Sequence, residues 1–170
     1  AIQPLVKGEL TAEDLGFKVG PLLNSDGRLA SAFGSVSFLL AADDQTASEW
    51  IGYLQEQNQQ RKTIQQQVTT QGMQIAAQQV QAGRISLCVY LADGHAGVHG
   101  ISASRIKDSY GRPTVFLAPK NGEEDLLTGS IRGIAGFDVG AAIASIIQSH
   151  PNLLVAGGGH AGAGGVTLYK

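Results

Sequence analysis

The chain has 170 residues, a length that fits one domain or one domain with an appendage. Apolar residues make up 43% and charged residues 15%, which excludes a disordered chain because a core can be built. A net charge of −2 excludes a general basic field for nucleic acid or an anionic membrane, so a polyanion would have to be held by a few placed arginines.

The sequence also bears on where the protein works. It has a single cysteine, no run of 18 apolar residues, and no basic leader before an apolar stretch. We therefore expect a cytoplasmic protein with no membrane partner. Because the chain opens on "AIQPL" without methionine, we also expect a fragment of a longer protein.

Residues 1–42 predict short helical pieces, the remnant of a region between domains. Thr11 can cap the first helix, since the residues after it are acidic and suit a helix N-terminus. Residues 20–28 (GPLLNSDGR) are rich in turn-forming Asn, Asp and Gly, so a loop is expected. Residues 29–41 predict a buried helix, and a strand is the alternative.

Residues 43–82 predict one long connecting helix. The stretch contains 13 glutamines between Gln45 and Gln81 and no proline, and its apolar residues recur at roughly helical spacing. Gly83 can end the helix. A polar helix with a narrow apolar stripe suits a strut between two domains. Low-complexity disorder is the alternative, and the apolar stripe argues against it.

From Gly83 onward the sequence predicts a compact α/β module. The expected strands are 84–92, 113–119, 125–133 and 164–170, and the expected helices are 97–111 and 136–150. The first two strands and the helix between them form a β-α-β unit. Cys88 lies inside the first strand, without a close basic neighbour, so we expect a buried and inert thiol.

Few residues suggest metal or hydrolytic chemistry. His95 and His99 are four apart and could share a helix face, but no HExxH arrangement or third ligand accompanies them. The simpler interpretation places one in a loop and the other at a helix start. The acidic residues form no cluster that could hold two divalent cations.

An anion site is the stronger interpretation of the polar motifs. Residues 157–165 (GGGHAGAGG) predict a phosphate-binding loop, in which the amides of Gly158 and Gly159 and the side chain of His160 are donors. Ser130 and Arg132 lie two apart in a predicted strand, so both side chains would point to one face. Together these residues predict a phosphate clamp.

Five motifs also resemble those of a known family. In chain order they are "GPLLNSDGRL", similar to G-P-R-[IL]-N-A-A-G-R-L; "LQEQNQQRK", to L-x-x-x-N-x-x-R-Q; "GHAGVHGISASR", to W-H-x-G-V-[IV]-G-I-V-A-[SG]-R; "TGSIRGIAGFD", to G-S-x-R-S-[IV]-x-G-F-[DN]; and "GGGHAGAGGVTL", to F-G-G-H-x-x-A-A-G-[LV]-T-L. Over about 150 of its residues, the chain resembles the C-terminal part of the RecJ-type single-stranded-DNA exonucleases of the DHH phosphoesterase superfamily.

The resemblance implies an α/β fold: a mixed β-sheet flanked by helices, preceded by the long connecting helix. Residues 83–170 would be the DHH-associated C-terminal domain. The family's catalytic domain carries aspartates and an Asp-His-His triplet that bind two Mn²⁺ or Mg²⁺ ions, and this triplet is not in the sequence. We therefore expect the catalytic domain to be missing, with no catalytic residue, metal site or nuclease activity in this chain alone.

The resemblance also assigns substrate-binding positions one by one. The matched positions are Asn24, Arg28, Asn58, Arg61, His95, Arg105, Ser130, Arg132 and His160. In the family the last two motifs face the metal site and grip the nucleic-acid backbone. The departures from the family pattern are Gly94, Lys62, Gly133 and His99. They leave open whether the polymer is DNA, RNA or a short oligonucleotide.

Three functions are weighed. The favoured one is the single-stranded-DNA-binding portion of a RecJ-like 5′–3′ exonuclease in DNA repair and recombination. The first alternative is a phosphodiesterase of short oligoribonucleotides or cyclic dinucleotides from the same superfamily. The second is a RecJ-like adaptor without enzymatic activity. The long glutamine-rich helix and "LNSDGR" favour the exonuclease.

Overall fold

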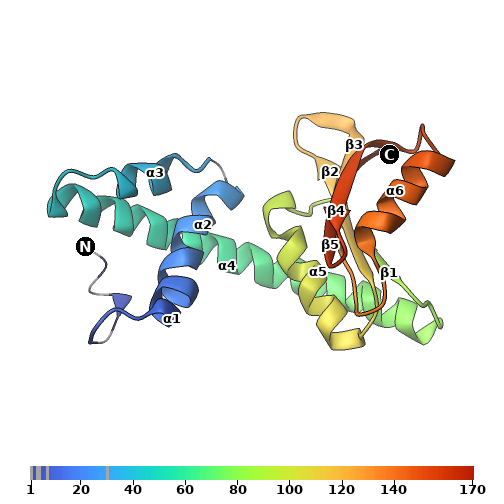
Figure 1. Cartoon of the computed structure of the whole chain (residues 1–170), viewed down its shortest axis with the longest axis horizontal. Coiled ribbons are helices and arrows are strands. Elements are labelled where there is room, and N and C mark those ends of the chain that lie inside the picture. Colours follow the sequence, from blue (N-terminus) through green and yellow to red (C-terminus); the bar gives the residue numbers. More distant parts are fainter. Residues whose placement is uncertain (1, 3–4, 7, 30) are drawn as a thin grey trace. The chain divides into compact units, whose positions relative to one another are not determined.

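The structure is a computed structural model that describes residues 2, 5–6, 8–29 and 31–170. It divides into two compact units, Ala1–Ile64 and Gln65–Lys170, and helix α4 (Asp44–Gln81) contributes to both (Figure 1). Among the described residues, no helix is both long and apolar enough to cross a membrane.

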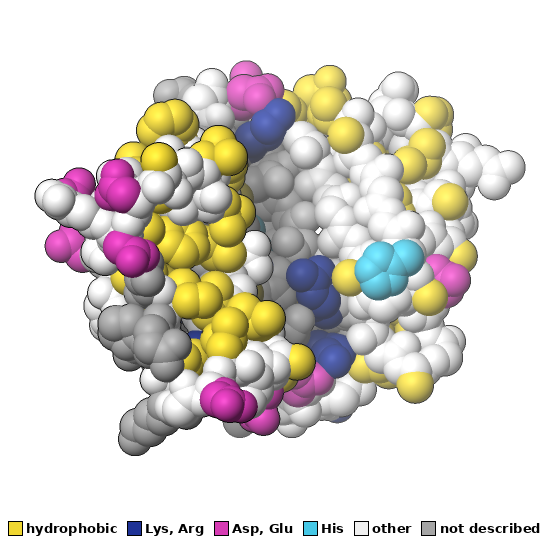
Figure 2. Space-filling view, turned by 60° about the vertical axis from the view of Figure 1, so that its left-hand side comes forward, with side chains coloured by type: hydrophobic (Ala, Val, Ile, Leu, Met, Phe, Trp, Pro, Cys, Tyr) yellow, Lys and Arg dark blue, Asp and Glu magenta, His cyan; other side chains and the backbone are white. Residues whose placement is uncertain are grey.

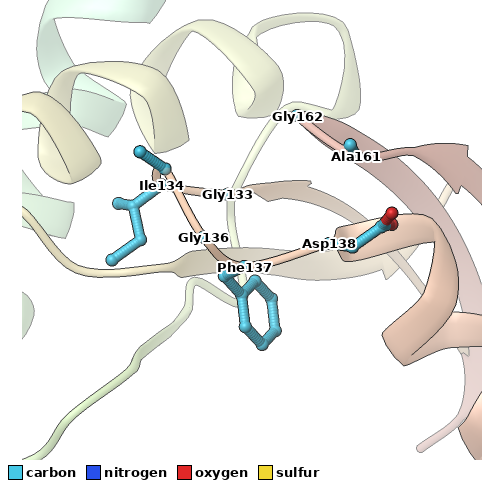
Figure 3. A pocket seen from close by; sticks show the side chains of 8 residues that line it. Gly133, Ile134, Gly136, Phe137, Asp138, Ala161 and Gly162 are labelled. Atoms are coloured by element: carbon cyan, nitrogen blue, oxygen red, sulfur yellow. The ribbon is translucent and has the colours of Figure 1, made fainter.

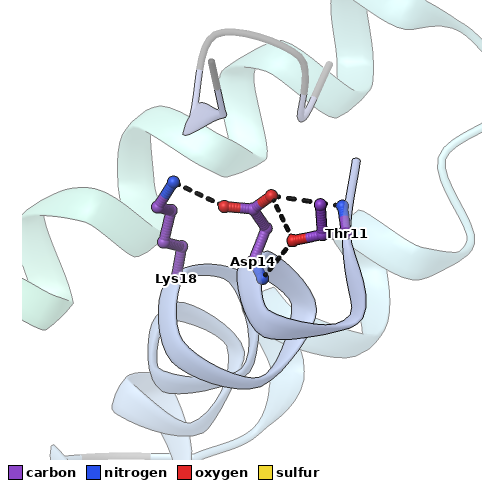
Figure 4. A network of polar contacts seen from close by, with 3 residues as sticks. All are labelled: Thr11, Asp14 and Lys18. Carbon is purple, nitrogen blue, oxygen red and sulfur yellow. Dashed lines mark hydrogen bonds and ion pairs between the residues drawn. The ribbon is translucent and has the colours of Figure 1, made fainter. Parts of the chain in front are cut away.

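The first unit begins with a capped helix. Helix α1 (Ala12–Asp14) starts at Thr11, whose hydroxyl accepts a hydrogen bond from the Asp14 amide at 3.2 Å (Figure 4). The Asp14 carboxylate accepts one in return from the Thr11 amide at 3.1 Å, so the predicted cap is confirmed as a capping box. The ion pair with Lys18 at 2.5 Å, together with these Thr11 contacts, lowers the pKa of Asp14 to about 2.

The loop predicted for residues 20–28 is wrong. A π-helical turn over Leu15–Val19 runs directly into helix α2 (Gly20–Leu29), which includes the turn-forming residues. The reason is tertiary. The buried carboxylate of Asp26 accepts hydrogen bonds from the Gly34 amide at 2.7 Å and the Tyr53 hydroxyl at 2.9 Å. Because its side chain is satisfied by distant partners, it does not compete for the local backbone.

Helix α3 (Phe33–Leu39) is the helix predicted within residues 29–41, so the helical option is the correct one. It is not buried as expected. The side chains of Phe33 and Leu39 are 69% and 67% exposed.

The long helix is confirmed as α4 (Asp44–Gln81), 38 residues in length. Its start is capped by Asp43, whose carboxylate accepts a hydrogen bond from the Thr46 amide at 2.7 Å. Gly83 ends it in the left-handed conformation, with φ of +75°. Within the second unit, α4 packs closely on the sheet, because a Cβ at Gly72 would lie 2.8 Å from the Phe116 ring.

The second unit is built on a mixed sheet, as predicted, but the sheet has five strands, and the strand over 154–160 is not among the four expected from the sequence. Its elements are β1 (Leu87–Tyr90), α5 (Ala96–Tyr110), β2 (Thr114–Lys120), β3 (Glu123–Arg132), α6 (Val139–Ser149), β4 (Leu154–His160) and β5 (Ala163–Tyr169). The strand order is β1-β2-β3-β5-β4, with β1 parallel to β2 and the other pairs antiparallel. Helix α5 makes the crossover between the two parallel strands, as the β-α-β prediction requires (Figure 1).

The two helices after β1 cover opposite faces of the sheet. Helix α6 packs Val139 and Ile143 against Val166 of β5. Helix α5 packs on the face to which Ser130 and Arg132 project, since both approach Gly100 of that helix. Side chains alternate along a strand, so Ile131 of β3 lies on the α6 face, whereas Ser130 and Arg132 lie on the α5 face together with the buried Phe116 of β2.

The glycine-rich run 157–165 is not a loop, which corrects the prediction. Gly157, Gly158 and Gly159 belong to strand β4, and only Ala161 and Gly162 connect it to β5. The pairing with β5 satisfies the backbone of the run, so hydrogen bonds to a neighbouring strand override the weak strand preference of glycine.

Cys88 is exposed, which corrects the prediction of a buried thiol. It alternates outward on the edge strand β1, where the Gln79 side chain occupies the open backbone position. The Gln79 amide donates to the Cys88 carbonyl at 2.6 Å and accepts from its amide at 2.8 Å. This pair of hydrogen bonds covers one edge of the sheet.

We expect Cys88 to react slowly with thiol reagents at neutral pH despite its exposure. Desolvation raises the pKa of the thiol above its usual value of 9.0, so little thiolate is present at pH 7. The rate of alkylation with iodoacetamide should rise steadily up to pH 9 and beyond. A rate that levels off below pH 8 would contradict this prediction.

Candidate nucleic-acid interface

Arg132, Ala163 and His160 form one row across three adjacent strands. Arg132 on β3 pairs with Ala163 on β5, which in turn pairs with His160 on β4. Directly opposed residues project to the same face, so the side chains of Arg132 and His160 share a face. Strands lie about 4.8 Å apart, which puts their Cα atoms about 10 Å apart. The small Ala163 between them leaves room for a ligand group that contacts both.

Ser130 belongs to the next row on the same face. It pairs with Gly165 of β5, which pairs with Gly158 of β4. The expected shared face of Ser130 and Arg132 is therefore present. Beyond Ser130 the row has no side chains, because both partners are glycine.

The guanidinium of Arg132 is held in a fixed direction. Its Nε donates to the Ser104 hydroxyl at 3.1 Å, and its Nη1 donates to the Ile131 carbonyl at 2.8 Å. The Ser104 hydroxyl in turn donates to the Gly100 carbonyl at 3.0 Å. Arg132 is half-buried, so its orientation is set by α5 and by its own strand.

His160 is exposed, and its tautomer is set by the hairpin turn. The Gly162 amide donates to Nδ1 of His160 at 3.2 Å. An acceptor Nδ1 carries no proton, so the neutral ring carries its proton on Nε2. The Nε2–H group can therefore donate to a phosphate oxygen.

Gly158 and Gly159 differ in their surroundings. A Cβ at Gly158 would meet nothing within 4 Å, whereas a Cβ at Gly159 would lie 2.6 Å from the Gly164 Cα. Gly158 is thus open to a ligand, and Gly159 is required by the packing of the hairpin. A shallow hollow of about 400 Å³ lies over this part of the sheet, where Gly158 and Gly165 meet Thr128 and Thr167.

A second hollow, of about 580 Å³, adjoins the ends of the same strands. The loop that follows Arg132 and the turn that follows His160 line it, and the Gly133 amide joins the two through a 2.9 Å hydrogen bond to Gly162. Figure 3 shows Ile134 and Phe137 projecting from the loop. Phe137 is 41% exposed. The hollow is thus bordered by the segments that follow Arg132 and His160, and Asp138 also lines it.

On the face shown in Figure 2, the described basic side chains do not form a broad field. Figure 2 shows the lysine and arginine side chains of one face scattered among neutral ones, and no continuous basic patch covers the described residues on that face. Individual contacts, and not a general positive surface, are therefore the means by which this face can hold an anion.

His95, His99 and Arg105 occupy three different environments on α5. His95 is the N-cap of the helix, and its side chain accepts from the Gly97 amide at 3.2 Å, as predicted for one histidine of the pair. His99 is not the expected loop histidine: it is 1% exposed and stacks on Phe116 with ring centroids 4.9 Å apart. Arg105 is exposed. Its neighbour Ser104, which the sequence did not single out, is the residue that contacts Arg132.

The other predicted contacts lie in the first unit. Arg61 donates to the Asn58 side chain at 2.7 Å along α4, so these two positions form a pair. Asn24 and Arg28 line a hollow of about 260 Å³ on α2. Each pair is a local arrangement, and its part in substrate binding remains a prediction.

Residues 2, 5–6, 8–29 and 31–170 contain no group of three or more His, Cys, Asp or Glu side chains arranged to hold a metal ion.

A comparison with protein families shows to which family the chain belongs. The DHHA1 domain family matches residues 83–170, which is more than half of the chain. The chain belongs to the DHHA1 domain family. The matched range begins directly after α4 and contains the row of Arg132 and His160.

Full-length relatives extend the likeness beyond the DHHA1 domain. The single-stranded-DNA-specific exonuclease RecJ of Haemophilus influenzae is 36% identical over 165 residues, and that of Dickeya dadantii is 37% identical over 170. Each match covers 95% of this chain and 28% of the relative. The chain thus spans less than a third of the length of these relatives.

Solved structures show the same arrangement of elements. RecJ from Thermus thermophilus in complex with Mn²⁺ superposes with a TM-score of 0.81 at 26% identity, covering 98% of this chain and 23% of that one. The structure of the same protein with Mg²⁺ gives a TM-score of 0.79 at 25% identity. The resemblance to the C-terminal part of the RecJ-type exonucleases is confirmed, and so is the fold class.

Proposed function

We propose that this DHHA1 chain is the nucleic-acid-binding portion of a RecJ-like 5′–3′ single-stranded-DNA exonuclease, acting in the cytoplasm in DNA repair and recombination. The row of Arg132 and His160, with Ser130 beside it, carries the proposal. It combines a planar cationic fork, an N–H donor and a hydroxyl on one face of the sheet, which is the chemistry that holds a phosphodiester.

Each group has a distinct task in this proposal. Arg132 supplies the positive charge and a rigid fork for phosphate oxygens. His160 and Ser130 add hydrogen-bond donors without a further permanent charge, so the bound strand can still advance through the site. None of them reads a base edge, so binding is independent of sequence. Gly158 lets the backbone of the strand approach the sheet closely.

Hydrolysis belongs to the rest of the longer protein. The RecJ structures that match this chain were solved with Mg²⁺ or Mn²⁺, ions that activate water and neutralise charge on a phosphodiester. In this proposal the catalytic domain that binds the metal is outside the chain, and the chain alone is inactive. Asn24, Arg28, Asn58, Arg61, His95 and Arg105 are proposed as further contacts along the same strand.

Replacing Arg132 by alanine should weaken the binding of a fluorescent oligothymidylate about tenfold or more. A charge-assisted hydrogen bond contributes about 1.5–3 kcal/mol, which corresponds to this loss. In the wild type, three or four phosphate contacts should give a slope of about −2 to −3 for log affinity against log salt concentration, and the variant should have a shallower slope. Fluorescence anisotropy measures both quantities.

Arg84→Ala is the matched control, because Arg84 is exposed, lies in the same unit and is not among the proposed contacts, so its replacement removes the same charge. It should weaken binding less than Arg132→Ala does. Equal losses from the two variants would mean that only net charge matters, and the phosphate row would be wrong. Binding of a diribonucleotide as tight as that of the long strand would instead favour the oligoribonucleotide alternative.

A further inference from the structure

Two residues of helix α5, Gly100 and Ser104, contact Arg132 without belonging to the phosphate row. They are 28 or more positions from Arg132 in the sequence and lie one helical turn apart, so they present adjacent surfaces to strand β3. Ser104 accepts the Nε–H of Arg132, and Gly100 lies against Nη2.

Gly100 provides space that no other residue would leave. A Cβ at this position would overlap the Nη2 atom of Arg132 and lie 3.3 Å from its Cζ. The atom it would displace is the far end of a flexible side chain, so an alanine can be accommodated by moving the guanidinium. The helix itself would gain, because alanine is the better helix former.

Ser104 is oriented before it meets Arg132. Its hydroxyl donates to the Gly100 carbonyl at 3.0 Å, as serines in helices often do, which leaves an oxygen lone pair for the Nε–H. A second hydrogen bond, from Nη1 to the Ile131 carbonyl, fixes the plane of the guanidinium. Helix α5 and strand β3 therefore each hold one edge of the guanidinium.

We propose that Gly100 and Ser104 are positioning residues that aim Arg132 at the phosphate. The inference rests on the proposed function and adds to it a pair of residues that act only through the arginine. In this arrangement, the glycine sets where the guanidinium lies and the serine sets its rotation. The pair does not touch the substrate.

The test is a double-mutant cycle in strand binding. Gly100→Ala should weaken the binding of an oligothymidylate nearly as much as Arg132→Ala does, while thermal unfolding stays at or above the wild-type temperature. Ser104→Ala should weaken binding about fivefold, because the guanidinium loses the hydrogen bond that sets its rotation. Ser104→Thr should restore binding, since threonine can make the same back-bond in a helix.

In the Arg132→Ala background, neither Gly100→Ala nor Ser104→Ala should cause a further loss, because residues that act through one group are not additive. Ser48→Ala is the matched control: its hydroxyl also bonds the carbonyl four residues earlier, at 2.7 Å, but it lies on α4. It should leave binding unchanged.

The outcomes separate the two proposals. If Arg132→Ala binds like the wild type, the proposed phosphate site fails. If Arg132→Ala weakens binding but Gly100→Ala and Ser104→Ala do not, or if their losses persist without the arginine, the positioning role fails and the phosphate site stands.

Discussion

Gly159→Ala is expected to destabilise the second unit strongly, whereas Gly158→Ala should leave its stability nearly unchanged. The two glycines are neighbours in β4 and project to opposite faces of the sheet. A methyl group at Gly159 would lie 2.6 Å from the Gly164 Cα and would overlap the Ala163 carbonyl, whereas one at Gly158 would meet nothing within 4 Å. The clashing atoms belong to the backbone of β5, which cannot move without breaking its pairing.

The expected cost of Gly159→Ala is about 3 kcal/mol, at the upper end of the usual range for overpacking. Thermal unfolding followed by circular dichroism should show a midpoint lower by about 10 °C. Gly158→Ala should shift it by no more than about 2 °C. The same variant should still weaken strand binding, because its methyl group projects over the open face that carries His160.

If Gly158→Ala destabilises the unit more than Gly159→Ala does, β4 does not have this register. Equal small effects would show that the run is a flexible segment and that the hairpin forms only with a partner. The two variants therefore test whether each glycine is needed for packing of the hairpin or for access of the ligand. We expect the packing role for Gly159 and the access role for Gly158.

The sequence was sufficient for elements whose information is local. The helix α4 follows from its spacing of apolar residues, the absence of proline and the stop at Gly83, all of which lie within the segment itself. The shared face of Ser130 and Arg132 follows from strand alternation alone. The capping role of Thr11 rests on residues within one turn.

The sequence predictions are wrong where contacts with residues distant in the sequence determine the local structure. Asp26 is helical because its carboxylate is satisfied by Gly34 and Tyr53, 8 and 27 residues away. The glycine run is a strand because β5 pairs with it. Cys88 is exposed because β1 ends the sheet, and no local pattern says which strand is at an edge.

The candidate site shows the same division. The residue types of the phosphate clamp were predicted from the sequence, but the row depends on β5 lying between β3 and β4. The contact of Ser104 with Arg132 depends on the rotation of α5 about its axis. A glycine and a serine four apart, in "GISAS", were the only signal that could have suggested it.

The stability of the second unit should fall as the pH is lowered from 6.5 toward 4, because of His99. This side chain is 1% exposed, stacks on Phe116, and its Nε2 atom has no hydrogen-bond partner among the described residues. Burial, together with the nearby His95, lowers its pKa from 6.5 to about 4. Between these two pH values, the unfolded chain binds a proton at His99 and the folded chain does not. The free energy of unfolding therefore decreases as the pH falls.

The full effect is about 3 kcal/mol, from a pKa difference of roughly 2.5 units. It is absent above pH 6.5, where His99 is neutral in both states, and complete near pH 4. Urea unfolding at a series of pH values measures it as a change in midpoint. The interval lies above the pH at which Asp14 loses its charge, because the pKa of that carboxylate is about 2.

His99→Leu should flatten the pH dependence between 6.5 and 4, since leucine fills the space beside Phe116 without binding a proton. His150→Ala is the control, because this histidine is exposed at the end of α6 and its removal should leave the slope as in the wild type. If His99→Leu keeps the wild-type slope, another group takes up the proton on unfolding and the assignment to His99 is wrong. If both variants flatten the curve equally, burial is not the cause, because only one of the two histidines is buried.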